Sequence, residues 1–366
     1  MSSIPPGPPP AGAPPGVPPQ QPHWPAPPGA AAPRESRGIA FFVAIFLGIL
    51  LLVSAGLNVL LLLLSVGSLA GAGLEGGGSY DEVHVAGDRG SDHQVLQIGI
   101  RGAIAEGASP LLGAAGGTVS QVERALRYAK SQQVEGVLLY IDSPGGGVTD
   151  SDRIYQMLKR FREQNPQMPV AALYGDMAAS GGYYVAVAAE HIISRRTSIS
   201  GSIGVIMSAW NFAKLAEDYG VEQVAIKSDR TPYKDMLSPT RALSEGERAM
   251  LTSIVDELYD QFVSVVMEGR EMQRDAVERV ANGGIYTAKQ SLEHGLVDEI
   301  GDYESALEWF KNRLGHKVAI VEQRRHAGLA DLLFGMSSAN TKNSSVESLL
   351  TSSTGPRFLY FWQGGR

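Results

Sequence analysis

The chain has 366 residues, a formal net charge of −7 and no cysteine. The absence of cysteine excludes disulfides, thiol catalysis and zinc sites with cysteine ligands. The negative charge, without a long run of Lys or Arg, argues against a nucleic-acid partner, because phosphate binding needs a clustered positive surface.

The N-terminal region, residues 1–38, has an unusual composition. Fourteen of the 21 prolines fall within the first 33 residues, mostly among Gly and Ala. Such a stretch has few side chains to bury. We therefore expect residues 1–38 to be a Pro/Ala/Gly-rich disordered tail, partly of polyproline type. A docking segment for another protein is the alternative.

Residues 39–66 are 28 consecutive residues without a charge, and their only polar side chains are Ser54, Asn58 and Ser65. As a helix they would span about 42 Å, more than the ~30 Å hydrocarbon core of a membrane, which a tilt accommodates. A cleaved signal peptide is the alternative, but its apolar region has only about 7–15 residues behind a short leader. The long preceding tail favours a retained transmembrane anchor.

The orientation of this anchor follows from its flanking cations. Arg34 and Arg37 stand directly before the apolar run, whereas the first cation after it is Arg89. The positive-inside tendency predicts a single-pass protein of the cell inner membrane, with a cytoplasmic N-terminus and an extracytoplasmic catalytic region. Residues 67–92, rich in Gly, Ser and acidic residues, are expected to be a linker.

From about residue 93 onward, predicted strands alternate with predicted helices. The segment 134–142 is apolar at successive positions, as expected for a parallel strand that is covered on both faces. The alternation predicts an α/β fold of layers with crossover connections. Further strands are expected at 95–100, 169–175, 191–196 and 221–228, and helices at 119–133, 151–164, 212–220, 244–269 and from 276.

Two turns of small residues each follow a predicted strand. They are DSPGGG at 142–147 and MAASGG at 177–182. Glycine lets the backbone approach a ligand closely, and two N–H groups directed at one point form an oxyanion hole. Ser180, within the second turn, is placed as an exposed nucleophile would be. Either turn alone is a weak signal, since most Gly-rich turns only reverse the chain.

A serine nucleophile needs a base, and the histidines do not supply an obvious one. His191 lies at the start of a predicted strand, where a structural role suits it better. A lysine can act as the base if desolvation lowers its pKa by several units from about 10.4. Lys227 and Lys234 both lie in the loop before the long helix. Lys234 has apolar neighbours, whereas Lys227 precedes a polar run, so we favour Lys234.

Five segments together resemble the signal peptide peptidase A family, which comprises serine–lysine peptidases of the Clp/crotonase-type fold. The resemblance covers roughly residues 93–315. The segments occur in the family's order: DSPGGG (142–147), MAASGGYYVA (177–186), SISGSIGVI (198–206), YKDMLSP (233–239) and GIYTAKQSLEHGLVDEIG (284–301).

The resemblance implies a role for each of five residues. Ser180 would be the nucleophile and Lys234 the general base, while Ser202 would hydrogen-bond the lysine amine. Gly146 and Gly181 would supply the N–H groups of the oxyanion hole. No metal or other cofactor is implied.

The resemblance also implies an organisation and a substrate. We expect an α/β, Clp/crotonase-type layered fold of repeated strand–helix units, preceded by one transmembrane helix. Residues 93–322 would be the serine–lysine peptidase domain, and 323–366 a mostly disordered C-terminal tail with apolar patches at 329–334 and 358–362. The expected assembly is a ring-shaped homo-oligomer whose sites are shared between subunits. Its substrates would be peptides, such as leader (signal) peptides left after export.

Two other functions remain open at this stage. A crotonase-type acyl-CoA enzyme would share the fold and the Gly-built oxyanion hole, but it would use carboxylates and would not need Ser180. Asp176 is the only acid near that turn. An inactive membrane scaffold is the third interpretation, and the presence of both Ser180 and Lys234 argues against it.

Overall fold

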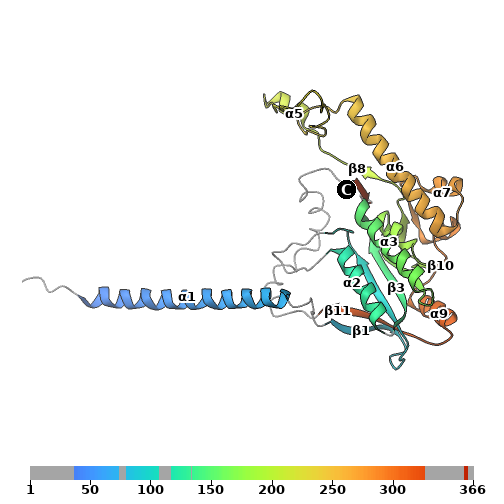
Figure 1. The fold of residues 1–366 in the computed structure, drawn as a ribbon, viewed down its shortest axis with the longest axis horizontal. Coiled ribbons are helices and arrows are strands. Elements are labelled where there is room, and N and C mark those ends of the chain that lie inside the picture. The colour runs from blue at the N-terminus through green and yellow to red at the C-terminus, as the bar shows by residue number, and fades with distance from the viewer. Residues whose placement is uncertain (1–36, 74–79, 107–116, 133, 326–357, 362–366) are drawn as a thin grey trace, which may run out of the picture. The chain divides into compact units, whose positions relative to one another are not determined.

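A computed structural model gives the fold of most of the chain (Figure 1). The chain divides into two units, Met1–Gly77 and Gly78–Arg366. Most of the predicted N-terminal tail and the apolar segment 329–334 lie outside the described residues. The described residues are 37–73, 80–106, 117–132, 134–325 and 358–361.

The first unit contains a single long helix among its described residues, α1 (Arg37–Gly73). Its central part, Phe41–Leu61, has a mean hydropathy of 2.5, and none of it is buried in the protein. At about 1.5 Å per residue this 21-residue part extends over ~32 Å, enough to cross the ~30 Å core of a membrane. The predicted apolar helix is therefore present, and it is long enough to span.

In the described part of the second unit, nine strands form one sheet, in which β1, β11, β2, β3, β5, β6 and β10 lie in that order. Pairing is parallel from β11 to β10, and β7 extends the sheet beside the end of β5. Strands β1 and β9 are antiparallel to their neighbours. The strands are β1 (Tyr80–Gly87), β2 (Gln94–Arg101), β3 (Val134–Ser143), β5 (Val170–Ala179), β6 (His191–Ser194), β7 (Ile199–Gly201), β9 (Ile285–Thr287), β10 (Glu299–Ile300) and β11 (Ala319–Arg325).

Helices cover both faces of this sheet, because successive side chains of its strands point to opposite sides. In β3, Val137 and Leu139 pack with α2 and α3, whereas Leu138 packs with Phe310 of α9. Figure 1 shows α2 and α3 lying across β2 and β3. The predicted α/β layered fold is thus confirmed. The covering helices are α2 (Thr118–Ser131), α3 (Val148–Gln164), α4 (Gly181–Ala186) and α9 (Tyr303–Leu314).

The chain between β7 and β9 contains three helices and the short strand β8. The predicted long helix is α6 (Glu245–Arg270), and its start is fixed by a capping box in which the Ser244 side chain accepts a hydrogen bond from the Glu247 backbone N–H. The remaining helices described here are α5 (Ala213–Asp218), α7 (Arg274–Val280) and α8 (Ala288–Glu293).

The structure differs from the sequence-based expectations in three segments. Residues 67–92, expected to be a linker, contain β1, which pairs along its length with β11. Residues 221–228, expected to be a strand, form none, because no sheet edge lies beside them. Val224 and Ile226 there are 77% and 98% exposed.

The third difference lies at the C-terminal end. Within the expected tail 323–366, residues Phe358–Phe361 form β12. This strand pairs antiparallel with β4 (Gly145–Gly147) on one side and with β8 (Ile206–Met207) on the other. An apolar strand buries its side chains when two neighbouring strands offer free edges. The apolar FLYF run therefore forms a strand here, because it gains burial that a polar segment would not gain.

Candidate active site

Ser180 lies at the turn between β5 and α4, as the sequence predicts. Its backbone has φ 51° and ψ −116°, a conformation that costs a non-glycine residue on the order of 1–3 kcal/mol. The strain is held in place by packing, since Ser180 is 1% exposed and its N–H donates to the carbonyl oxygen of Gly201 at 2.7 Å. A strained, over-determined serine at the end of a parallel strand is typical of a functional position.

The glycine turn after β3 packs directly against this serine turn. A Cβ atom on Gly181 would lie 2.5 Å from Ser151 Oγ and 3.1 Å from the backbone nitrogen of Gly146. A Cβ atom on Gly146 would lie 1.9 Å from the carbonyl oxygen of Ile104. Neither glycine can carry a side chain here. The backbone nitrogens of Gly146 and Gly181 are thereby brought close together beside Ser180.

The two turns meet because β3 and β5 are parallel neighbours that end at the same edge of the sheet. Their register pairs Ser143 with Ala178, which are the second residues of the two turns. The Ser143 hydroxyl then fixes the first turn: it donates to Gly102 O at 2.6 Å and accepts from the Gly145 N–H at 3.1 Å.

Ser202 also lies close to Ser180. Strand β7 pairs in parallel with the end of β5, and the last pair is Ala179 with Gly201. The next residues on the two strands are Ser180 and Ser202, and both have φ 51°. Ser202 is 7% exposed, and its N–H donates to Gly284 O at 2.6 Å. The register thus places the predicted auxiliary serine beside the predicted nucleophile.

Lys234 is not joined to Ser180 within the single chain. Its side chain is exposed, and among the described residues it makes no hydrogen bond or ion pair. Tyr233 shields the Lys234 side chain from water less than the sequence predicts, because Tyr233 itself is 42% exposed. Within the described residues, no surface buries the Lys234 amine.

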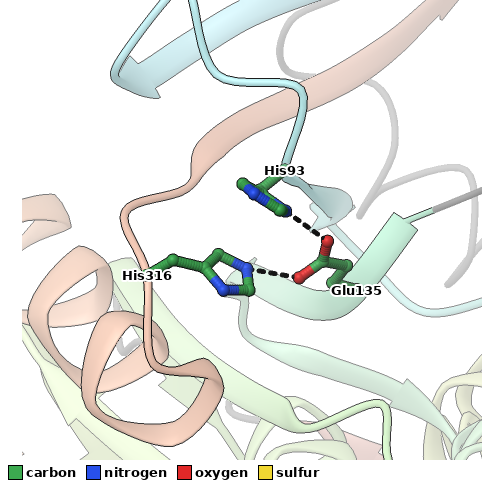
Figure 2. A group of neighbouring side chains, drawn as sticks. All are labelled: His93, Glu135 and His316. Atoms are coloured by element: carbon green, nitrogen blue, oxygen red, sulfur yellow. Dashed lines mark hydrogen bonds and ion pairs between the residues drawn. The ribbon is translucent and has the colours of Figure 1, made fainter.

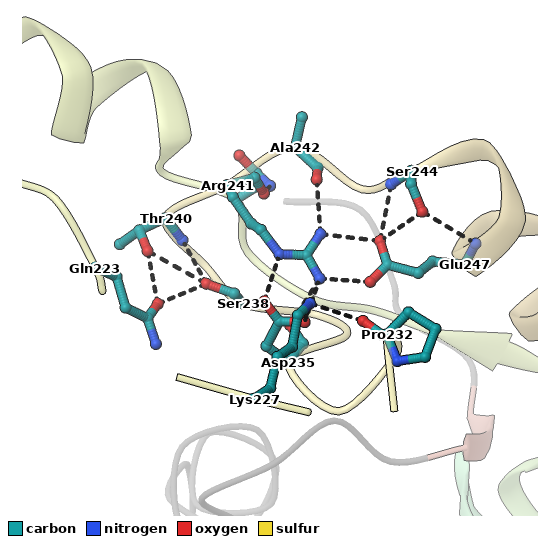
Figure 3. Close-up of polar contacts among 11 residues, drawn as sticks. Gln223, Lys227, Pro232, Asp235, Ser238, Thr240, Arg241, Ala242, Ser244 and Glu247 are labelled. Carbon is teal, nitrogen blue, oxygen red and sulfur yellow. Dashed lines mark hydrogen bonds and ion pairs between the residues drawn. The ribbon is translucent and has the colours of Figure 1, made fainter. Parts of the chain in front are cut away.

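Lys227, the alternative base, is held by polar partners (Figure 3). Its ammonium donates to Pro232 O at 2.7 Å and forms an ion pair with the carboxylate of Asp235. Asp235 is therefore directed at Lys227, and Lys227 is held by partners within its own loop.

Arg241 links this loop to the start of α6. Its guanidinium hydrogen-bonds Asp235 Oδ1 at 3.1 Å and Glu247 Oε2 at 2.9 Å (Figure 3). Hydrogen bonds from Lys227 and then Arg241 lower the pKa of Asp235 to about 2. Hydrogen bonds from Arg241 and then the Ser244 backbone lower the pKa of Glu247 to about 2. The ion pairs of Arg241 thus fix the C-terminal end of the Lys234 loop to the start of α6.

The segment before this loop exposes many large apolar side chains. An uncovered apolar surface of this size on a soluble region commonly marks an interaction site. We call it the exposed apolar segment. Its members and exposures are Trp210 82%, Phe212 47%, Leu215 56%, Tyr219 78%, Val221 61%, Val224 77% and Ile226 98%.

Strand β12 lies against the Gly146 turn and the Ser180 turn, a feature that the sequence does not predict. Tyr360 pairs with Gly146 and is fully buried. Its ring centroid lies 4.9 Å from that of Tyr184 and 4.7 Å from that of Phe262, and its hydroxyl donates to the carbonyl oxygen of Leu258 at 3.0 Å. The only sequence signal for this contact is the aromatic run FLYFW at 358–362 within a Ser-rich stretch.

Comparison with known proteins now identifies the family. Residues 162–317 match the sequence profile of peptidase family S49, a range that includes Ser180, Ser202 and Lys234. A putative protease from Synechocystis sp. is 40% identical over 216 residues, which are 59% of this chain and 73% of that protein. The chain belongs to peptidase family S49. It is therefore a serine peptidase, and the resemblance to the signal peptide peptidase A family is confirmed.

Other relatives match smaller shares of their own length. A putative signal peptide peptidase SppA from Enterococcus faecium is 39% identical over 182 residues, which are 50% of this chain and 52% of that protein. The chain thus spans about half of that relative. Among solved structures, a ClpP1 mutant from Listeria monocytogenes aligns with 56% of this chain and 91% of its own, at 16% identity and a TM-score of 0.37.

The Arg241 network predicts that the Lys234 loop loosens in acid. Because the pKa values of Asp235 and Glu247 are depressed from 3.8 and 4.5 to about 2, their stabilisation is present above pH 4.5 and is lost as the pH falls towards 2. Hydrogen-exchange protection of residues 235–247, corrected for intrinsic rates, should fall over this range. The Arg241→Met variant should already lack that protection at pH 6. Protection that persists to pH 2, or that survives in Arg241→Met, would contradict the role of the network.

Proposed function

We propose that the chain hydrolyses peptide bonds with Ser180 as nucleophile and Lys234 as general base. The observation that supports this most is the packing of the strained Ser180 turn against the Gly146 turn. Ser180 Oγ attacks the peptide carbonyl and passes its proton to the neutral Lys234 amine. The N–H groups of Gly146 and Gly181 stabilise the oxyanion. The lysine then protonates the leaving amine, and water, deprotonated by the same lysine, releases the acyl group from Ser180.

A second copy of this chain completes the site in this proposal. Lys234 must be neutral to act, yet the described part of the chain leaves it exposed, and in this proposal a neighbouring subunit supplies its desolvation. The exposed apolar segment, Trp210–Ile226, directly precedes the Lys234 loop and provides a surface to be covered. We therefore place Lys234 of one subunit beside Ser180 and Ser202 of its neighbour, in a ring-shaped homo-oligomer.

The substrate binds in extended form along β4. Peptides commonly add as a strand to a free sheet edge, where backbone hydrogen bonds give affinity and side-chain pockets give selectivity. β12 occupies such an edge, with an aromatic side chain, Tyr360, buried beside the Gly146 and Gly181 turns. A substrate peptide with small or apolar side chains would take the same place. β12 is then an internal competitor for the site.

The membrane helix favours leader peptides as substrates. Such peptides remain in the membrane after export and are themselves apolar.

The orientation in this proposal follows the positive-inside tendency. Arg34 and Arg37 before the apolar run favour a cytoplasmic N-terminus, with the peptidase region outside the inner membrane. Digestion of the region after α1 by protease added to spheroplasts tests this orientation. Protection of that region would reverse it.

Activity of three variants tests the dyad. Ser180→Ala and Lys234→Arg should each reduce peptide hydrolysis at least about 1,000-fold, since a coupled nucleophile and base act as a unit and arginine does not deprotonate. Lys227→Ala, the matched control from the same loop, should keep most of its turnover. Turnover of an apolar peptide by the full chain in detergent measures this. An active Ser180→Ala, or an inactive Lys227→Ala beside an active Lys234→Arg, would overturn the assignment.

Mixing two inactive variants tests the shared site. Co-expressed Ser180→Ala and Lys234→Ala chains should regain roughly a quarter of wild-type turnover, because random mixing places an intact serine next to an intact lysine at about a quarter of the interfaces. Each variant expressed alone is the control. If serine and lysine came from the same chain, the mixture would stay inactive, and the proposed assembly would be wrong.

Replacing Tyr360 tests whether β12 competes with substrate. In Tyr360→Ala the strand loses its buried ring, so the β4 edge is free for longer and KM should fall at least about threefold while kcat stays unchanged. Tyr360→Phe keeps the ring and loses only the hydrogen bond to Leu258 O, so it should behave almost as wild type. A rise in KM or a loss of kcat in Tyr360→Ala would mean that β12 builds the site instead.

A further inference from the structure

A cluster of two histidines and one glutamate lies away from the Ser180 site (Figure 2). His93 Nδ1 is 2.6 Å from Glu135 Oε1, and His316 Nε2 is 2.5 Å from Glu135 Oε2. The three ligand-type atoms lie within 4.8 Å of one another. The residues come from positions 93, 135 and 316, so no local spacing in the sequence reveals the cluster.

The sheet holds these three residues in fixed positions. His93 directly precedes β2, Glu135 is the second residue of β3, and His316 lies between α9 and β11. Strands β11, β2 and β3 are consecutive neighbours in the sheet. The His93 carbonyl oxygen also accepts the N–H of Ala319, the first residue of β11, at 2.8 Å. The backbone therefore presents all three side chains from one edge of the sheet.

We infer that His93, Glu135 and His316 bind a divalent transition-metal ion of the zinc type. Two imidazoles and one carboxylate are a common three-residue ligand set for Zn²⁺, with water at the fourth position. The ligand set involves no cysteine, so the cysteine-free sequence does not exclude it.

The distances allow an ion with only small side-chain movements. Zinc–nitrogen and zinc–oxygen bonds of about 2.0–2.2 Å place two ligands of one tetrahedral ion roughly 3.4 Å apart. Each Glu135 oxygen lies 2.5–2.6 Å from an imidazole nitrogen, so the two atoms would separate by about 1 Å when an ion binds between them. The side chains of His93, Glu135 and His316 are 48%, 31% and 34% exposed, so an ion can enter from solvent without opening the core.

The two imidazoles converge on one carboxylate, as the ligands of a single ion would. Their ring centroids are 3.7 Å apart, and each ring directs a nitrogen at an oxygen of Glu135. The histidines have one charged sequence neighbour each, Asp92 beside His93 and Lys317 beside His316, and these two charges are opposite. Glu135 therefore supplies the net negative charge of the cluster.

The position of the cluster in the sheet indicates that a bound ion would stabilise the fold and take no part in catalysis. It lies at the start of β3, whereas the Ser143 turn that meets Ser180 lies at the strand's other end. Eight residues at about 3.3 Å each separate the two ends by roughly 26 Å. An ion there touches neither Ser180 nor Lys234. It would fasten the starts of β11, β2 and β3 to one another.

Zinc binding to the full chain tests the inference independently of peptide turnover. The purified protein in detergent, freed of any affinity tag and treated with chelator, is titrated with Zn²⁺ in competition with a chromophoric chelator. We expect one tight site per chain. His93→Ala, His316→Ala and Glu135→Gln should each weaken it at least about tenfold. His84→Ala, a histidine of β1 outside the cluster, should leave it unchanged.

Thermal unfolding provides the second readout. Zn²⁺ should raise the Tm of the wild type and of His84→Ala but not that of the double variant His93→Ala/His316→Ala. Circular dichroism of the metal-free variants checks that they are folded, and Glu135→Gln preserves the side-chain volume. Absence of a saturable site in the wild type would overturn the inference. So would variants of the three residues that bind Zn²⁺ as the wild type does.

Discussion

The turns that follow β3 and β5 approach each other so closely that a side chain fits at neither Gly146 nor Gly181. This close approach depends on the parallel pairing of the two strands, which ends at Ser143 and Ala178. It brings two backbone N–H groups next to Ser180, and a larger residue at either glycine would separate them. The helices on both faces keep the strands in register. The chemistry of the site thus rests on the packing of the sheet.

The proposed base, Lys234, is the group that the described part of one chain leaves uncovered. Ser180 and Ser202 are brought together by the β5–β7 register, whereas Lys234 lies exposed in a loop beyond the exposed apolar segment. The Arg241 network holds Asp235, which also pairs with Lys227. Lys234 thus lies in an anchored loop but is exposed to solvent. This is consistent with a lysine that becomes desolvated when two subunits associate. Assembly and activity would then be coupled.

Local patterns predicted most of the fold and the turn that carries Ser180. The apolar strand 134–142 and the turn containing Ser180 could be recognised because their signals lie within a few consecutive residues. Residues 221–228 look like a strand, but strand formation needs a neighbouring edge, which a sequence pattern does not report. The pairing of β12 with β4 and the cluster around Glu135 depend on residues far apart in the chain. Long-range contacts of this kind become visible only in three dimensions.

The most direct test of the account is the site of covalent modification by a serine-directed probe. The full chain in detergent is treated with a fluorophosphonate, and the adduct is located by mass spectrometry of its peptides. The account predicts one adduct per chain, on Ser180, with labelling greatly slowed in Lys234→Ala. An adduct on another serine would contradict it, as would a catalytically active preparation in which Ser180 is unmodified.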